Sequence, residues 1–312
     1  MFRNILVPLD GSSLSEKALP LALQIAWRAG ATLRLTCVLA PPVANSPPAH
    51  PGVPRDEQEA LDMAAWRVRQ AVAGNIRQAD YGKKVLTSLI EGPVATTLSE
   101  HASGVGADLI VMTTHGRGTM SRFWLGSVTD ELIRRSTIPI LVVRPADNTR
   151  SGSKLTKDVP FHRVIVPLDG SPLAETALGP AAALARLFGA TVELFYAVPC
   201  LQAIMAEGNV LTQPAADATF LHEMIRQANA MLNKSAAGLQ GVGLQVATTV
   251  VVAEEQIAAA ILNRTRTGDV IALATHARGP STRWFLGSVA DKVIRGADVP
   301  VLVVRPSGKP TR

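Results

Sequence analysis

Short apolar runs alternate with stretches of helical periodicity along the first half of the chain. Each apolar run ends at a polar or glycine-containing turn, which is typical of buried strands. The predicted strands are Ile5–Pro8, Thr32–Leu39, Val85–Ile90, Leu109–Thr113 and Ile138–Val143. The predicted helices are Ser13–Ala29, Asp56–Asp80, Val94–Gly104 and Ser127–Arg135. This alternation predicts right-handed crossovers and a five-stranded parallel sheet covered by helices on both faces.

The second half repeats this order of elements. Its predicted strands are Val164–Pro167, Thr191–Val198, Gln245–Val252, Val270–Ala274 and Val299–Val304. Its predicted helices are Ala174–Phe188, Ala218–Leu239, Gln256–Thr267 and Ser288–Arg295. The residues repeat as well: Arg122 to Pro145 and Arg283 to Pro306 are identical at more than half of their positions, and V-P-L-D-G-S occurs after the first strand of each half. The chain is therefore a tandem duplication of a unit of about 145 residues, and any site should be sought twice.

Domain boundaries follow from this duplication. We expect one domain at residues 1–146, a polar linker at 147–160 and a second domain at 161–312. Each half is large enough to bury its own core. The prolines of Pro41–Pro54 predict a long exposed loop, and Pro199–Pro214 is an irregular stretch in the other half. The fold class is α/β, with two tandem Rossmann-like domains.

Composition agrees with this fold and narrows the class of ligand. Hydrophobic residues make up 47% of the chain and aromatic residues only 4%, so aliphatic side chains build the core, as in buried parallel sheets. The formal charge of +6 comes from scattered residues without a basic tail, which favours a phosphorylated small molecule over nucleic acid.

The remaining composition points to an ordinary intracellular protein. Cys37 and Cys200 lack metal-ligand or redox spacing and are interpreted as small buried apolar residues. Because no apolar run approaches about 18 residues and the N-terminus leads directly into a strand, we expect a soluble, cytoplasmic protein.

Two segments of the first half converge where ligands bind in parallel sheets, at the carboxyl ends of strands. One is P-L-D-G-S after the first strand, and the other runs from Thr113 to Ser127 after the fourth. Gly116 and Gly118 let the backbone approach a ligand closely. Gly126 and Ser127 begin a helix whose free N–H groups attract an anion. This pattern predicts a phosphate site, with a tight turn as the alternative.

These residues resemble the universal stress protein family, whose nucleotide-binding members carry the pattern G-x-x-G-(nine residues)-G-[ST]. Thr113 stands at the first glycine, and Gly116, Gly126 and Ser127 match the rest. The resemblance covers both halves, including the opening V-P-L-D-G-S and the closing L-V-V-R-P strand. It implies an adenine nucleotide alpha hydrolase-like fold and ATP as the ligand, alone or with Mg²⁺.

The resemblance also implies a role for individual positions of the first half. Asp10 would hydrogen-bond the ribose and Val38 would lie beside the adenine, while the glycine loop would hold the phosphates. The candidate nucleotide-binding residues are Pro8, Leu9, Asp10, Val38, Thr113, Gly116, Arg117, Gly118, Gly126 and Ser127. Two alternatives stay open: Asp10 could serve a turn or helix cap, and the Arg117 side chain could simply be exposed.

The second half departs further from the family pattern. Its weaker candidate site comprises Asp169, Ala274, Ala277, Gly287 and Ser288. Ala274 and Ala277 replace glycines of the pattern, and Ala197 replaces Val38. If position 277 requires a positive φ, its methyl group costs roughly 1–2 kcal/mol, equivalent to about a tenfold or greater loss of affinity. We therefore expect the second half to bind nucleotide weakly or not at all.

The sequence favours regulated binding over rapid catalysis. His115 and His276 flank the two loops without a nucleophile or carboxylate pair at recognisable spacing. A Walker lysine and acidic residue are also missing. We expect a stress-response module with slow or no ATP hydrolysis, and two alternatives stay open: a nucleotide-free interaction protein and a weak ATPase activated by a partner.

The closing strand of each half suggests how the halves associate. Ile138–Val143 and Val299–Val304 are apolar edge strands. They resemble the dimerisation strand of the family. This resemblance implies an intra-chain pseudo-dimer, with a homodimer of the chain as a further option.

Overall fold

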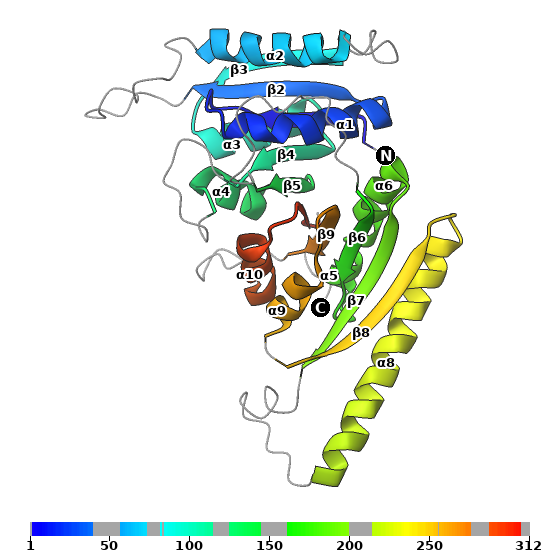
Figure 1. The fold of residues 1–312 in the computed structure, drawn as a ribbon. Helices are drawn as coiled ribbons and strands as arrows, with labels where there is room; N and C mark the ends of the chain where they lie inside the picture. The colour runs from blue at the N-terminus through cyan, green and yellow to red at the C-terminus, as the bar shows by residue number, and fades with distance from the viewer. Residues whose placement is uncertain are drawn as a thin grey trace, which may run out of the picture. The chain divides into compact units, whose positions relative to one another are not determined.

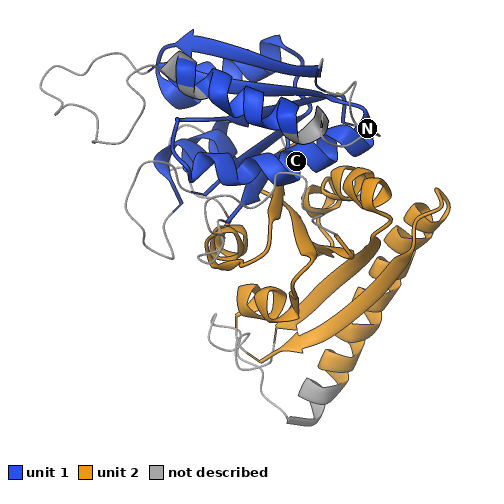
Figure 2. Cartoon of the chain, turned by 45° about the horizontal axis from the view of Figure 1, so that its top comes forward, with its two compact units in different colours: residues 1–160 blue, residues 161–312 orange. Residues whose placement is uncertain are grey.

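The computed structural model describes residues 2–39, 57–73, 82, 84–114, 125–144, 161–199, 214–254, 256–275 and 287–306. The chain divides into two compact units, residues 1–160 and 161–312, which are coloured separately in Figure 2. Each is an α/β unit with a parallel sheet, which confirms the predicted fold class. The predicted loop Pro41–Pro54 and the linker 147–160 lie outside the described residues, as do residues 200–213.

Unit 1 contains a parallel sheet in the strand order β3-β2-β1-β4-β5 (Figure 1). Its strands are β1 (Asn4–Pro8), β2 (Thr32–Leu39), β3 (Val85–Glu91), β4 (Leu109–Thr113) and β5 (Ile140–Val143). Its helices are the 3₁₀ turn η1 (Ser15–Ala18) and the α-helices α1 (Leu19–Ala29), α2 (Glu57–Ala73), α3 (Val94–Gly104) and α4 (Ser127–Arg135). The chain builds outward from β1 through β2 to β3, then crosses to β4 on the other side of β1.

Unit 2 repeats this topology, in the order β10-β9-β6-β7-β8. Its strands are β6 (Arg163–Pro167), β7 (Thr191–Pro199), β8 (Val246–Ala253), β9 (Asp269–Ala274) and β10 (Val301–Val304). Its helices are α5 (Pro172–Glu175), α6 (Leu178–Phe188), α8 (Pro214–Gln240), α9 (Ile257–Arg264) and α10 (Ser288–Gly296). In this unit the crossing lies between β6 and β9.

The prediction of one continuous helix after the first strand is wrong in both units. In unit 1 the 3₁₀ turn η1 precedes α1, and in unit 2 the short α5 ends before α6 begins. Pro20 lies in the first turn of α1, where its missing N–H leaves no hydrogen bond unmade. Pro180 lies three positions into the stretch that forms α6. Each proline marks the start of the main helix, so the upstream residues form a separate turn.

Aliphatic side chains fill the centre of each sheet. The middle three residues of β1 and of β6 have no exposed surface: Ile5, Leu6 and Val7, and Val164, Ile165 and Val166. Burying one such side chain stabilises a fold by roughly 1.5–3 kcal/mol. In the described part of the chain, no helix is long and apolar enough to cross a membrane.

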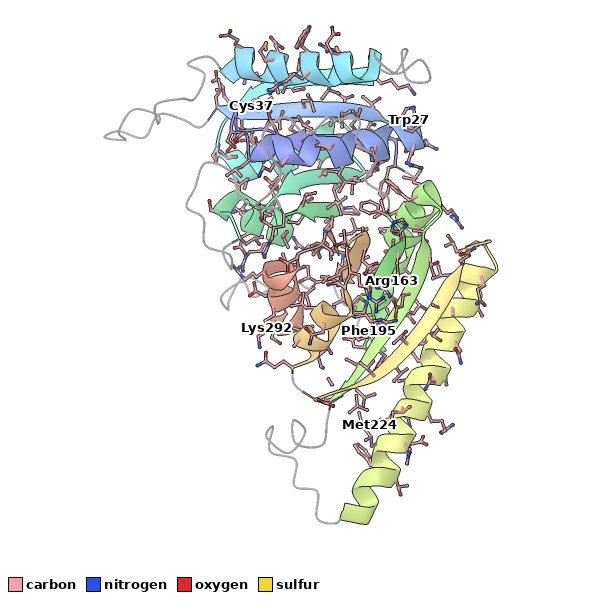
Figure 3. All side chains as sticks on the ribbon, viewed as in Figure 1. Trp27, Cys37, Arg163, Phe195, Met224 and Lys292 are labelled. Carbon is pink, nitrogen blue, oxygen red and sulfur yellow. The ribbon has the colours of Figure 1, made fainter. Side chains whose placement is uncertain are left out.

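A buried charged cluster lies at the strand starts of unit 2, around the labelled Arg163 in Figure 3. The Arg163 guanidinium donates to Glu193 Oε2 at 2.6 Å and to Asp269 Oδ1 at 3.1 Å. Glu193 Oε1 also accepts from Thr249 Oγ1 at 2.6 Å and from Arg264 Nε at 2.8 Å. Hydrogen bonding to Asp269 and the nearby carboxylates raise the pKa of Arg163, which stays charged. The Glu193 side chain is only 1% exposed, so its carboxylate has lost its contact with water. The hydrogen bonds within the cluster compensate for this loss.

Unit 1 carries the opposite charge at the equivalent strand position. Arg34 of β2 is aligned with Leu6 of β1, just as Glu193 of β7 is aligned with Ile165 of β6. The Nε atom of Arg34 is buried and has no hydrogen-bond partner among the described residues. Burial and the positive charge of Arg34 lower the pKa of His101 on α3. The duplicated scaffold therefore tolerates a network of ion pairs in one copy and an arginine beside a histidine in the other.

Candidate functional site

The carboxyl ends of β1 and β4 lie next to each other in unit 1, because these two strands pair in parallel. The connections leave them in opposite directions, toward β2 from one and toward β5 from the other. A crevice between diverging connections is where open α/β sheets bind ligands. β6 and β9 create the equivalent point in unit 2. The candidate residues flank these two places.

Asp10 forms a tight turn directly after β1. Its Oδ1 accepts hydrogen bonds from Ser12 N at 3.0 Å and from Ser12 Oγ at 2.6 Å. Gly11 between them has a φ of 78°, which favours glycine. Ser15 Oγ donates back to Ser12 O at 2.9 Å and so holds the turn against η1. The turn role that the sequence left open for Asp10 is observed, and ribose binding stays a prediction.

Pro8 and Leu9 fix the chain at this point of the sheet. Leu9 is buried, and its N–H donates to Thr36 O of β2 at 2.8 Å. Val38 follows on the same strand, half-buried and aligned with Ile90 of β3. Sequence reasoning missed Thr36, whose fully buried hydroxyl has no hydrogen-bond partner within the described part of the chain.

The start of α4 is fastened to the end of β4. Gly126 N donates to Thr114 O at 2.7 Å, and Thr129 Oγ1 donates to Thr113 O at 3.1 Å. Thr113, Thr114 and Thr129 are all buried. Sequence reasoning missed Thr129, although a threonine in the first turn of a helix that follows a buried strand is a usable signal.

The first turn of α4 offers hydrogen-bond donors at a surface position. Its N-cap, Gly126, provides no side-chain cap, and Ser127 is exposed. The first N–H groups of a helix lack intrahelical partners, and the helix dipole places partial positive charge there. An anionic group next to Ser127 would therefore be stabilised.

Part of the predicted site belongs to the segment between β4 and α4. Gly116, Arg117 and Gly118 lie outside the described residues, together with His115. Ala277 and His276 of the second half lie outside them as well. The described members of the first site are thus those before and after the glycine loop.

Unit 2 keeps the aspartate turn after its first strand, but the residues around this turn differ from those in unit 1. Asp169 Oδ1 accepts from Ser171 N at 2.9 Å, and the Asp169 side chain is exposed, whereas that of Asp10 is half-buried. Gly287 precedes α10 without a side-chain cap, and Ser288 is exposed. Ala290 stands at the position of Thr129 and has no hydroxyl to donate.

The two sites also differ in the side chains at two strand positions. Ala197 is buried at the position of Val38, and Ala274 ends β9 where Thr113 ends β4.

Chemically, each site offers one carboxylate for hydroxyl groups and a helix start for an anion. Among the described residues, no group of three His, Cys, Asp or Glu side chains is placed to hold a metal ion.

Comparisons with known proteins point to the same family for both halves of the chain. The sequence profile of the universal stress protein family matches residues 1–144 and 160–305. A universal stress protein of Mycolicibacterium smegmatis is 29% identical over 305 residues, which are 97% of each chain. Universal stress protein Rv2005c of Mycobacterium tuberculosis is 27% identical over 313 residues, again 97% of each chain.

A solved structure supports the fold over the same length. The crystal structure of PA1789, a functionally unknown protein from Pseudomonas aeruginosa PAO1, covers 98% of this chain and 93% of its own. The TM-score is 0.63 at 18% sequence identity, so this likeness concerns the fold alone.

Proposed function

The chain belongs to the universal stress protein family as a tandem two-domain member, and on this premise we propose that unit 1 binds an adenine nucleotide, with ATP as the preferred ligand. ATP would bind alone or with Mg²⁺. The observation that carries the proposal is the convergence at the β1–β4 crossing point. There the Asp10 turn, the end of β4 and the uncapped start of α4 come together.

Each part of an adenine nucleotide has a matching group in unit 1. The Asp10 carboxylate suits the ribose hydroxyls, and the half-buried Val38 offers apolar surface to the base. Gly126 and Ser127 suit the phosphates, together with Gly116, Arg117 and Gly118 of the preceding loop. This division of roles follows from the family resemblance and agrees with where the described residues lie.

We propose that unit 2 binds nucleotide weakly or not at all. Ala274 and Ala277 occupy the glycine positions of the pattern, and Ala290 lacks the hydroxyl that fastens Thr129. Asp169, Gly287 and Ser288 would supply whatever binding is left. The duplicated chain would then hold one working site.

The cellular role would be regulatory, in the cytoplasm. Nucleotide occupancy would change the conformation or the choice of partner, and hydrolysis would be slow or absent. The apolar strands β5 and β10, within the predicted Ile138–Val143 and Val299–Val304, would serve for pairing within the chain or between chains. The competing proposals are a nucleotide-free interaction protein and an ATPase that needs a partner.

The test combines identification with titration. Mass spectrometry of the purified protein should detect a co-purified adenine nucleotide, and isothermal titration of nucleotide-free protein should give one ATP site per chain. Asp10→Asn keeps the turn acceptor and removes the charge, and Asp169→Asn is its matched control.

The two variants should differ clearly. A hydrogen bond to a charged group contributes about 1.5–3 kcal/mol, so Asp10→Asn should weaken ATP binding roughly tenfold to a hundredfold. Asp169→Asn should leave this affinity unchanged. Absence of ATP binding to the unmodified protein, or two sites of equal affinity, would refute the proposal.

A further inference from the structure

Three side-chain atoms of unit 1 are buried without a hydrogen-bond partner among the described residues. They are Nε of Arg34 and Oγ1 of Thr36, both on β2, and Nε2 of His101 on α3. Arg34 and Thr36 are two positions apart on one strand, so their side chains lie on the same face of the sheet. Helix α3 packs on β2, and the charge of Arg34 acts on the His101 imidazole. Arg34 and His101 thus lie near each other between β2 and α3, with Thr36 further along the strand.

The same two places in unit 2 hold side chains of opposite charge. Glu193 of β7 occupies the position of Arg34. Arg264 of α9 occupies that of His101, because each is the eighth residue of its helix and follows a buried aliphatic side chain by three positions. Glu193 and Arg264 form an ion pair. Unit 1 instead has two nitrogen donors here and no acceptor from either side chain.

The network of unit 2 shows which chemistry satisfies donors at this end of a sheet. Glu193 Oε1 accepts from Arg264 Nε at 2.8 Å and from Thr249 Oγ1 at 2.6 Å. Arg163 binds Asp269 in a bidentate manner, with Nε at 3.1 Å from Oδ1 and Nη2 at 2.5 Å from Oδ2. Such charge-assisted contacts are among the strong hydrogen bonds of proteins. In each case the acceptor is a carboxylate.

Unit 1 uses its corresponding carboxylate for the backbone. Asp108 stands at the position of Asp269, and its two oxygens accept from Arg3 N at 2.6 Å and from Asn4 N at 3.2 Å. It does not bind Arg34 Nε, which has no partner in the described part of the chain. A buried donor without an acceptor destabilises the folded state. An acceptor from outside the chain would therefore stabilise unit 1.

Charge and access define the class of this acceptor. Burial and Arg34 hold the pKa of His101 below 6.5, so at pH 7 the permanent charge of this pair is the single one of the guanidinium. One negative charge matches it better than the two of a phosphate dianion. Arg34 and His101 are half-buried, and Leu86, aligned with Arg34 on the edge strand β3, is 39% exposed. A small anion can therefore reach the pair from the β3 side when the two side chains turn.

We propose that Arg34 and His101 form a binding site for a small monocarboxylate. The carboxylate accepts from Nε of Arg34 and from Nε2 of His101, with the Thr36 hydroxyl as a third donor. This place lies toward the strand starts of unit 1, whereas the candidate nucleotide site lies at the strand ends. The inference therefore does not depend on nucleotide binding.

Native-state hydrogen exchange of the full-length chain tests the site, with sodium acetate as the probe and sodium chloride at the same concentration as the reference. A ligand that binds only the folded unit slows exchange by a factor of one plus the ratio of its concentration to its dissociation constant. We expect a dissociation constant on the order of 1–10 mM for so small a ligand. The most protected amides of β2 should then exchange about five- to fiftyfold more slowly in about 50 mM acetate. Amides of β7 should not change, which separates binding from a general effect of acetate.

Substitutions locate the effect. Arg34→Met and His101→Leu each remove a donor and should each abolish the slowing of β2 exchange by acetate. His101→Gln keeps an amide donor and should retain part of it. Arg3→Met changes an exposed arginine at the same end of the sheet and is the matched control, in which the slowing should persist.

Three results would overturn the proposal. The first is equal exchange of β2 amides in acetate and in chloride. The second is a slowing by acetate that survives both Arg34→Met and His101→Leu, since the anion would then bind elsewhere. The third is a slowing by inorganic phosphate that depends on Arg34 and exceeds that by acetate, which would exclude a monocarboxylate as the preferred ligand.

Discussion

Replacing Glu193 by methionine should destabilise unit 2 far more than the equivalent change destabilises unit 1. Glu193 has almost no solvent contact and accepts hydrogen bonds from Arg163, Arg264 and Thr249. Methionine fills much of the same volume but accepts none of them. Arg163 would keep Asp269, whereas Arg264 would lose the carboxylate with which it forms an ion pair.

The magnitude follows from the burial of the network. Removing one member of a buried ion pair leaves uncompensated charge and costs about 3–5 kcal/mol. Arg34→Met is the matched change at the equivalent position of β2. Because the buried Nε of Arg34 has no hydrogen-bond partner among the described residues, we expect that variant to cost less than about 1 kcal/mol or to stabilise the unit.

Native-state hydrogen exchange measures each unit separately, which a single melting curve of a two-unit chain does not. In Glu193→Met, the most protected amides of β7 should exchange about two to four orders of magnitude faster, since each 1.4 kcal/mol corresponds to a factor of ten. Amides of β2 should not change in that variant. The reasoning is refuted if Glu193→Met and Arg34→Met accelerate exchange in their own units by similar factors.

Three further changes test other parts of the structure. Thr129→Val removes the hydroxyl that donates to Thr113 O, so α4 should lose roughly 0.5–1.5 kcal/mol of exchange protection; Thr129→Ser should restore it. The pKa of His101 lies below the ordinary 6.5 because of burial and Arg34, so the unfolded state takes up the proton first. Urea unfolding should therefore show stability falling as the pH drops below about 6.5, and His101→Gln should lessen that fall. Gly92→Ala should cost about 1–3 kcal/mol in the same assay, because the φ of 144° is unfavourable for alanine; an unchanged midpoint would contradict this.

Most of the fold could be predicted because the apolar pattern of each element and the repeat between the two halves are both visible in the sequence. Apolar runs and helical periodicity predicted β1 and α4 closely, and the repeat supplied the second copy of each element. The split before α1 was missed because helical periodicity outweighed Pro20 in the sequence pattern. Such boundaries depend on which N–H groups find partners, and that is not visible in periodicity alone.

The site was only partly predictable. Asp10 was proposed from its place after the first strand and from the family resemblance, and Ser127 from helix-start chemistry and the same resemblance. The charged cluster at the strand starts of unit 2, which is not part of this site, was not predicted, because Arg163 and Asp269 are 106 positions apart and come together only through strand pairing. Thr129 was missed for a related reason, since its partner is a backbone carbonyl at the end of another element.

The opposite charges at Arg34 and Glu193 also affect how a duplicated chain avoids misfolding. Two similar neighbouring domains risk exchanging equivalent strands while they fold. If β2 took the place of β7, Arg34 would lie beside Arg163 and Arg264, and the three guanidinium groups would share only the Asp269 carboxylate of this cluster. If β7 took the place of β2, Glu193 would enter unit 1 without the two arginines that bind it. Divergence at one buried position thus gives each half a chemical means of recognising its own strands.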